Sequence, residues 1–170
     1  MYYDEHPDAQ HDIHELHVVL LGERMKFLTD AGVFSKKMID FGSQVLLSCL
    51  SFQQGETVLD VGCGYGPLGL TLVKAQGVHA TMVDVNTRAL DLAQKNADLN
   101  QVEAKIFQSN VYDQVEGSFD HLNPGGDLTI VIQKKQGAPS AKAKMEEVFG
   151  NCEILKKDKG YYILRSEKVT

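Results

Sequence analysis

Two short runs near the N-terminus alternate between apolar and polar residues. They cover residues 14–20 and 24–29, and Gly22 lies between them. Alternation with a period of two predicts strands, and the intervening glycine predicts a tight turn, so we expect a β-hairpin. Residues 1–13 are polar and contain Pro7, which predicts a poorly ordered lead-in.

A helical pattern and then a β/α alternation follow the hairpin. Residues 30–34 have the composition of a loop, and we expect Ser35 to cap a helix whose apolar face includes Ile39, Leu46 and Leu50. Further predicted strands cover residues 57–61, 80–83, 106–107, 118–120, 128–132, 154–155 and 161–164, and further helices have Pro67, Thr87 and Ser140 at their N-terminal ends. This alternation predicts an α/β fold, with a Rossmann-like, doubly wound, mostly parallel sheet and a C-terminal antiparallel edge hairpin.

Composition narrows the class of protein. The 170 residues are 43% apolar and 24% charged, which is typical of one soluble globular domain with a modest extension. No run is long and apolar enough to span a membrane, and the acidic start is unlike a signal peptide. Cys49, Cys63 and Cys152 are far apart in the sequence, which predicts neither a disulfide framework nor a zinc site and favours the cytoplasm.

Charge is unevenly distributed along the chain. Residues 1–133 carry 8 basic and 18 acidic side chains, whereas residues 134–170 carry 9 basic and 5 acidic ones. The basic segment is either a surface that faces phosphates or a solvated lysine-rich face. Lys134 and Lys135 follow a predicted strand at the sheet edge where ligands bind, so we expect them to contact substrate.

The most informative motif is Asp-Val-Gly-Cys-Gly-Tyr-Gly at residues 60–66. It begins at the end of the predicted strand 57–61. Such glycines allow close approach of a ligand, and the following helix presents free N–H groups to it. Asp84 ends the next predicted strand and can accept hydrogen bonds from both ribose hydroxyls of an adenosine-containing cofactor. A dinucleotide also fits the glycine spacing, but Asp60 would repel its pyrophosphate and would attract the amino group of S-adenosylmethionine.

With these residues the chain resembles the class I S-adenosylmethionine-dependent methyltransferases, and in particular the small-methyltransferase-domain family that includes the 16S rRNA guanine-N2 methyltransferases of the C type. The resemblance also rests on residues 29–35 (Thr-Asp-Ala-Gly-Val-Phe-Ser), 40–43 (Asp-Phe-Gly-Ser), 83–86 (Val-Asp-Val-Asn) and 133–140 (Gln-Lys-Lys-Gln-Gly-Ala-Pro-Ser). It implies a hairpin extension over residues 1–34 and a methyltransferase domain over residues 35–170.

The resemblance implies roles for individual residues. The cofactor site comprises Asp60, Gly62, Cys63, Gly64, Gly66, Asp84, Val85, Asn86, Asn110 and Val111, and the substrate side comprises Phe34, Ser35, Lys134 and Lys135. Asn110 stands where such enzymes usually have Asp, so contact with the adenine amino group is altered but retained through the amide oxygen. The implied partner is ribosomal RNA or the small ribosomal subunit.

One family motif is absent. Relatives carry Asn-Pro-Pro after their fourth strand, where it holds the target amine in line with the methyl–sulfur bond. The only Asn-Pro here, Asn123-Pro124, has the appearance of a turn before the next strand, so the catalytic residue is unassigned.

The spacing around this point is too short. Only residues 121–127 separate the predicted strand at 118–120 from the next one, whereas a parallel crossover needs about a dozen residues or more. We expect about 25 residues to be missing between about His121 and Leu122, the size of part of a βαβ unit. Either a mobile segment is left out of the sequence, which predicts a Cα separation there well beyond about 3.8 Å, or the deletion is real.

Other candidates are weaker. His6, His11, His14 and His17 match no known metal-ligand spacing, so we expect no metal. Cys63 has no evident histidine partner and fits a small residue in a tight turn. Two alternatives to rRNA methylation remain: a non-catalytic module that binds cofactor or RNA, and a methyltransferase acting on protein or small-molecule amines.

Overall fold

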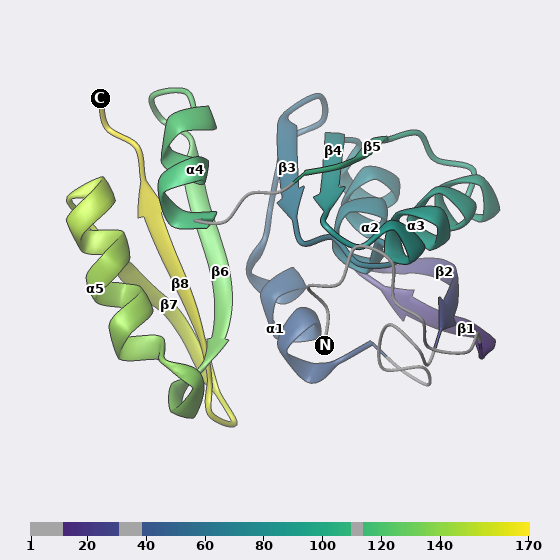
Figure 1. The fold of residues 1–170 in the computed structure, drawn as a ribbon, viewed down its shortest axis with the longest axis horizontal. Coiled ribbons are helices and arrows are strands. Elements are labelled where there is room, and N and C mark those ends of the chain that lie inside the picture. Colours follow the sequence, from purple (N-terminus) through teal and green to yellow (C-terminus); the bar gives the residue numbers. More distant parts are fainter. Residues whose placement is uncertain (1–11, 31–38, 110–113) are drawn as a thin grey trace. The chain divides into compact units, whose positions relative to one another are not determined.

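The computed structural model describes residues 12–30, 39–109 and 114–170 (Figure 1). The chain forms two compact units. Unit 1 comprises Met1–Asp40 with Ser51–Asn110, and unit 2 comprises Phe41–Leu50 with Val111–Thr170. Neither unit is a continuous stretch of sequence, because the segment 41–50 belongs to unit 2 although both of its neighbours belong to unit 1.

Unit 1 contains an antiparallel hairpin and a three-stranded parallel sheet of order β3-β4-β5. Its elements are β1 (Ile13–Leu20), β2 (Glu23–Asp30), β3 (Thr57–Val61), α2 (Pro67–Gln76), β4 (His79–Asp84), α3 (Thr87–Leu99) and β5 (Lys105–Gln108). A helix lies in each crossover between parallel strands, as such connections require. The predicted N-terminal hairpin and the predicted β/α alternation are both confirmed.

The turn between β1 and β2 explains how the hairpin closes. Leu21 and Gly22 both have positive φ, at 51° and 80°. Two successive residues in this region form a type I′ turn, whose twist matches that of the flanking strands. Gly22 adopts the conformation without steric cost, and its predicted place in the turn is confirmed.

The hairpin shares a core with the parallel sheet. Met25 and Phe27 of β2 and Met82 of β4 are at most 1% exposed. The Phe27 ring packs edge-on against Tyr65 of the glycine loop, with 5.8 Å between the ring centroids. The buried side chains of the two helices complete this core: Leu70, Leu72, Ala89, Leu92, Ala93 and Ala97. Folding of the loop after β3 is therefore coupled to the N-terminal hairpin.

Unit 2 is built on an antiparallel sheet of order β6-β8-β7. Its elements are α1 (Phe41–Cys49), α4 (Gln114–His121), β6 (Asp127–Gln133), the 3-10 turn η1 (Lys134–Gln136), α5 (Ala138–Phe149), β7 (Glu153–Asp158) and β8 (Tyr161–Glu167). Met145, Ile163 and Leu164 are fully buried in its core. The turn at Lys159 and Gly160 again has two positive φ values, 49° and 83°, so the predicted C-terminal hairpin is confirmed.

Three predicted helix starts need correction. Helix α1 begins at Phe41, directly after Asp40, which is a capping residue type like Ser35, so Ser35 is not its N-cap. Helix α3 is capped by Asn86 instead of Thr87, because the Asn86 carboxamide oxygen accepts two backbone hydrogen bonds. Helix α5 begins at Ala138 after Gly137, which places Ser140 inside its first turn.

The segment before β6 differs most from the prediction. Residues 118–120 are helical in α4 and do not form a strand. The Leu122 N–H donates to the Ser118 carbonyl at 3.1 Å, which continues the hydrogen bonding of α4 past His121. Gly126 N donates to Asn123 O at 2.9 Å, so the Asn123-Pro124 pair lies in a turn, as predicted. The expected loss of about 25 residues between about His121 and Leu122 stays a prediction.

The predicted α/β class is confirmed, but the strands are divided between two sheets. Among the described strands, β3 pairs only with β4, and β6 pairs only with β8. Every residue of β6 is half-buried, although Leu128 and residues 130–132 form a nearly continuous apolar run. A continuous apolar run is typical of a strand covered on both faces, so β6 has the sequence of an inner strand at the edge of a sheet.

Candidate functional site

The glycine loop after β3 turns on three left-handed residues. Gly62, Gly64 and Gly66 have φ values of 71°, 59° and 102°. The N–H groups of Gly62 and Cys63 both donate to the Val83 carbonyl at 2.9 Å, which fixes the loop against the end of β4. The loop thus presents backbone rather than side chains at the carboxyl ends of two parallel strands, where ligands bind in such sheets.

Asp60 caps the helix that follows this loop. Gly66 occupies the N-cap position of α2 and has no side chain for that role. Instead Asp60 Oδ2 accepts a hydrogen bond from Gly69 N, in the first turn of α2, at 3.1 Å. A Cβ on Gly69 would lie 3.0 Å from that carboxylate oxygen and 2.8 Å from Met82 Sδ. A glycine is therefore needed for β3, β4 and α2 to approach this closely.

Asp84 organises the same loop from the end of β4. Its Oδ2 accepts from Gly64 N at 2.9 Å, and its Oδ1 accepts from Asn86 N at 3.0 Å. Asn86 is buried and uses its carboxamide oxygen to cap α3 through Arg88 N and Ala89 N. Hydrogen bonds to Asp84 thus join Gly64 to Asn86, while the Asp60 carboxylate is bonded to Gly69 on the other side of the loop.

The surroundings of the Asp60 carboxylate favour a positively charged ligand group. Burial raises the pKa of its carboxyl group to about 6, the Gly69 N–H lowers that pKa, and the negative charge of Asp84 raises it. No basic side chain among the described residues offsets this charge. A carboxylate in such surroundings is stabilised by a positively charged ligand group. The donors and acceptors present therefore fit the amino group and ribose of S-adenosylmethionine, and they do not fit a diphosphate.

Cys63 does not have the properties of a nucleophile. The residue is buried, and its thiol lies 3.5 Å from the Gly64 carbonyl. Burial is the main cause that raises the pKa of this thiol, and the charges of Asp60 and Asp84 raise it further. The thiol therefore stays protonated, which agrees with its interpretation as a small residue in a tight turn.

The end of β5 lies beside this network. Ser109 N donates to the Asp84 carbonyl at 3.1 Å, and Gln108 Nε2 donates to the Val85 carbonyl at 3.1 Å. The chain therefore reaches the edge of the site just before the predicted adenine contacts. Four predicted site residues lie outside the described residues: Phe34, Ser35, Asn110 and Val111.

Sequence patterns missed a buried ion pair next to the site. Arg88 Nη2 of α3 lies 2.6 Å from Asp30 Oδ2 at the end of β2, and Asp30 is 1% exposed. Asp30 Oδ1 also accepts from Asp12 N at 3.0 Å, which ties the start of β1 to the same carboxylate. Because the partners are 58 positions apart in the sequence, no local pattern connects them.

Sequence patterns also failed to identify Asn96, although a polar residue on the apolar face of a helix is a recognisable signal. Its Nδ2 donates to the Tyr65 carbonyl at 2.8 Å, so the side chain holds the glycine loop from α3. Asn96 is fully buried beside Leu92, Ala93 and Ala97 on the apolar face of the helix. A polar residue at a buried helical position needs a partner, and this requirement could have identified it.

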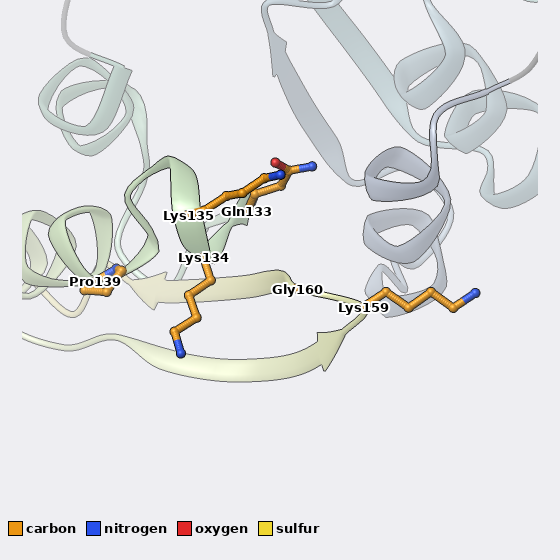
Figure 2. A pocket seen from close by; sticks show the side chains of 6 residues that line it. All are labelled: Gln133, Lys134, Lys135, Pro139, Lys159 and Gly160. Carbon is orange, nitrogen blue, oxygen red and sulfur yellow. The ribbon is translucent and has the colours of Figure 1, made fainter.

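The two predicted substrate lysines lie in unit 2 and flank a cavity. Lys134 and Lys135 are exposed in η1. A cavity of about 500 Å³ is lined by these lysines together with Gln133, Pro139, Lys159 and Gly160 (Figure 2). Of the predicted site residues, these two are therefore not part of the network around Asp60.

Metal-ligand clusters and membrane-spanning helices are both absent from the residues that the structure describes. Among these residues, no three side chains of His, Cys, Asp or Glu are grouped in a way that could hold a metal ion. No helix in the same ranges has the length and apolarity required to cross a membrane.

Comparison with known sequences gives a consistent result. The chain matches the sequence model of the methyltransferase small domain over residues 24–122 and 117–165. It is 40% identical to the uncharacterized protein YbxB of Bacillus subtilis over 201 aligned positions, which cover 99% of this chain and 98% of that protein. It is 33% identical to the ribosomal RNA small subunit methyltransferase C of Erwinia tasmaniensis, over 87% of this chain and 51% of the relative. The chain thus spans about half the length of the latter protein.

Solved structures show the same fold. The 16S rRNA N2 methyltransferase RsmC of T. thermophilus, in complex with AdoMet and guanosine, superposes with a TM-score of 0.80 at 23% identity, covering 92% of this chain and 50% of that one. A ribosomal protein L11 methylase from Lactobacillus delbrueckii gives a TM-score of 0.66 at 18% identity, covering 76% and 79%. These likenesses confirm the predicted Rossmann-like class.

Proposed function

The chain belongs to the methyltransferase small domain family of S-adenosylmethionine-dependent methyltransferases, and we propose that it methylates the exocyclic amine of a guanine in ribosomal RNA. The observation that carries the cofactor part of this proposal is the half-buried Asp60 carboxylate beside the glycine loop. That carboxylate has no cationic side chain near it in the described residues, and it faces the network anchored by Asp84.

The residues of unit 1 divide the cofactor between them. Asp60 holds the amino group, and the backbone of Gly62, Cys63, Gly64 and Gly66 packs against the methionine part. Asp84 binds the ribose hydroxyls with the lone pairs left by its two backbone hydrogen bonds. Val85, Asn86, Asn110 and Val111 surround the adenine. When bound, the sulfonium supplies an electrophilic methyl group, and the protein contributes mainly by positioning.

The rRNA substrate is supported by relatives and by charge. Relatives at 30–33% identity are named ribosomal RNA small subunit methyltransferase C, and the structure of the T. thermophilus enzyme contains guanosine. We place Phe34, Ser35, Lys134 and Lys135 on the substrate side. The partner is then ribosomal RNA or the small subunit, and the reaction takes place in the cytoplasm.

We further propose that a strand and a helix are missing within the methyltransferase domain, residues 35–170, after α4. The 201 positions aligned with the Bacillus relative exceed this chain of 170 residues, so about 30 of them have no counterpart here. The two matches to the family meet at residues 117–122. In the part of the chain that the structure describes, β3 and β6 each have one edge without a strand partner, which supports the same interpretation.

This shortened connection favours one alternative function. The family's Asn-Pro-Pro motif, which positions the target amine, is absent from this chain. If the cofactor site is intact without it, the chain is a module that binds S-adenosylmethionine or RNA and does not transfer a methyl group. Binding and transfer must therefore be measured separately.

Calorimetric titration tests the cofactor site. The wild-type chain should bind S-adenosylmethionine, and Asp60→Asn should weaken that binding about tenfold or more, because the charge opposite the amino group is lost. 5′-Methylthioadenosine lacks the amino acid part and serves as the matched ligand, since Asp60→Asn should leave its affinity unchanged. Equal losses for both ligands, or no binding by the wild type, would overturn the assignment.

Methyl transfer tests the reaction. The chain is incubated with S-adenosylmethionine labelled in its methyl group and with undermethylated small-subunit rRNA, and the nucleosides are then identified by mass spectrometry. N2-methylguanosine supports the proposal. Cofactor binding without transfer supports the non-catalytic module, and transfer to protein or small amines alone supports an amine methyltransferase of another class.

A further inference from the structure

We propose that one end of unit 2 is a binding surface for single-stranded RNA, an inference that rests on the proposed function because RNA is the substrate there. The surface, called here the hairpin-tip surface, consists of Phe41, Gln133, Lys134, Lys135, Lys159 and Tyr161. Four of these residues line the cavity of about 500 Å³ that Figure 2 shows. The surface lies where β6 ends and the β7–β8 hairpin turns, and it also includes η1 and the first residue of α1.

Backbone and side-chain hydrogen bonds hold this surface in shape. Lys134 N donates to the Gly160 carbonyl at 2.8 Å, which joins η1 to the hairpin turn. Gln133 Nε2 donates to the Tyr161 hydroxyl at 2.7 Å, which joins the end of β6 to β8. The lysines are therefore mounted on a fixed base, which reduces the entropy lost on binding.

Two half-buried aromatic rings lie beside the lysines. Phe41 and Tyr161 contact each other edge-on, with 5.7 Å between the ring centroids. Lys159 Nζ lies 4.8 Å from the centroid of the Phe41 ring. Lysines next to partly exposed rings are what single-stranded nucleic acids bind, because bases stack on the rings while phosphates pair with the cations.

The spread of the cations argues for a chain of phosphates over a single anion. In Figure 2 the Lys135 side chain runs alongside Gln133, whereas Lys134 and Lys159 extend in other directions. Their ammonium groups therefore do not converge on one point. Asp158 is the sole acid in residues 154–162, so little negative charge in this hairpin opposes these cations. A polyanion that crosses this surface can contact several of these cations in turn.

The test uses a fluorescent oligouridine of about 12 nucleotides, measured by anisotropy at several salt concentrations. The full chain with Lys134→Gln and Lys159→Gln should bind about tenfold more weakly, with a salt slope shallower by about 1.4, because two phosphate contacts are lost. The matched control is Lys95→Gln with Lys105→Gln, which removes the same charge from exposed lysines of unit 1 and should bind as the wild type does.

A second variant tests the rings. Phe41→Leu should weaken oligouridine binding several-fold without changing the salt slope, because stacking is lost and charge is retained.

Three outcomes would each overturn the proposal. They are equal weakening in both lysine double variants, a salt slope that is unchanged in Lys134→Gln with Lys159→Gln, and equal affinity of the wild type for duplex RNA or polyglutamate. S-adenosylmethionine titration of the wild type is run in parallel, so a failed cofactor site and a failed RNA surface give different results.

Discussion

At the scale of single residues, the site depends on the Asp60 carboxylate. Its surroundings disfavour a negative charge that has no positive partner. Asp60 caps α2 through Gly69 N, yet burial raises its pKa to about 6. The native state thus keeps a charge that the unfolded chain would solvate better. Such a cost in stability is expected where a ligand, rather than the fold, supplies the missing countercharge.

The pH dependence of stability follows from this raised pKa. Between about pH 4 and pH 6 the native state binds the Asp60 proton more tightly than the unfolded chain does, so its contribution to the unfolding free energy is lost as pH rises through about 6. Asp60→Asn should therefore be more stable than the wild type at pH 8, and the difference should disappear below about pH 4. Urea unfolding of both proteins across this range measures it; an unchanged difference would contradict the assigned pKa.

Cofactor affinity should have the opposite dependence. Asp60 must be ionised to hold an amino group, so wild-type affinity for S-adenosylmethionine should fall as pH drops through about 6. The affinity of Asp60→Asn should stay constant in that range. Calorimetric titrations at a series of pH values check this, and a parallel fall in the two proteins would assign the titration to another group.

Substitution of Gly66 tests whether the loop needs a residue without a side chain at this position. Its φ is 102°, and an added Cβ would lie 2.7 Å from Leu70 Cδ1. Gly137 is a matched control, because it is also an N-cap residue, at φ 115°, but has nothing within 4 Å. Gly137→Ala should cost about 1 kcal/mol of unfolding free energy, and Gly66→Ala about 2–4 kcal/mol. Denaturant unfolding measures both costs. Equal losses of unfolding free energy in the two variants would show that the contact between the added Cβ and Leu70 is relieved.

At the scale of elements, asparagine side chains of α3 continue the hydrogen bonding of the hairpin. Asn96 Oδ1 accepts from Leu28 N at 2.6 Å, and its Nδ2 donates to the Leu28 carbonyl at 3.0 Å. Asn100, one turn later, makes the same pair of bonds with Lys26. The outer edge of β2 is thereby satisfied by a helix in place of a third strand, which protects it from edge-to-edge pairing.

Replacing Asn96 should loosen the hairpin. Asn96→Ala leaves the Leu28 N–H and the Leu28 and Tyr65 carbonyls without this partner, at a cost of about 3 kcal/mol. Gln94→Ala, at an exposed position of the same helix, should cost less than about 0.5 kcal/mol. Urea unfolding gives both values, and hydrogen exchange of the Leu28 amide should accelerate only in the first variant. Equal exchange rates of the Leu28 amide in the two variants would show that the stability of β2 does not depend on its hydrogen bonds to α3.

At the scale of the whole molecule, α4 and the short connection that follows it both belong to unit 2, and each of the two units leaves apolar residues exposed. In unit 1, Leu59 of β3 and Phe107 of β5 are 45% and 52% exposed. In unit 2, the apolar strand β6 is half-exposed along its length. Exposed apolar surface and unpaired edges of this kind are expected to be covered in a stable fold. The strand and helix that we propose to be missing are expected to bury part of this apolar surface.

Restoring the segment should change how the molecule unfolds. The aligned residues of the Bacillus relative would be inserted between His121 and Leu122, and a glycine–serine linker of equal length is the control. Calorimetry should show separate transitions for the present chain and for the linker variant, and one cooperative transition for the restored chain. A single transition in all three proteins would contradict the proposed missing strand.

Sequence patterns were most informative where the cause of a structure is local. The hairpins, the β/α alternation and the glycine loop were all predicted, because strand periodicity and turn residues act over a few positions. The prediction failed at residues 118–120, which form a helix. A short segment takes its conformation from the strands it can pair with, and the described structure offers this segment none.

Residue types at fixed spacing were enough to predict the family, the acids at two strand ends and the glycines between them. Only the tertiary structure decided that Asp60 caps α2, that Asn96 and Arg88 tie the hairpin to the site, and that the strands form two sheets. The reason is physical: contacts between residues tens of positions apart exist only after the chain has folded, and they leave no periodic signal in the sequence.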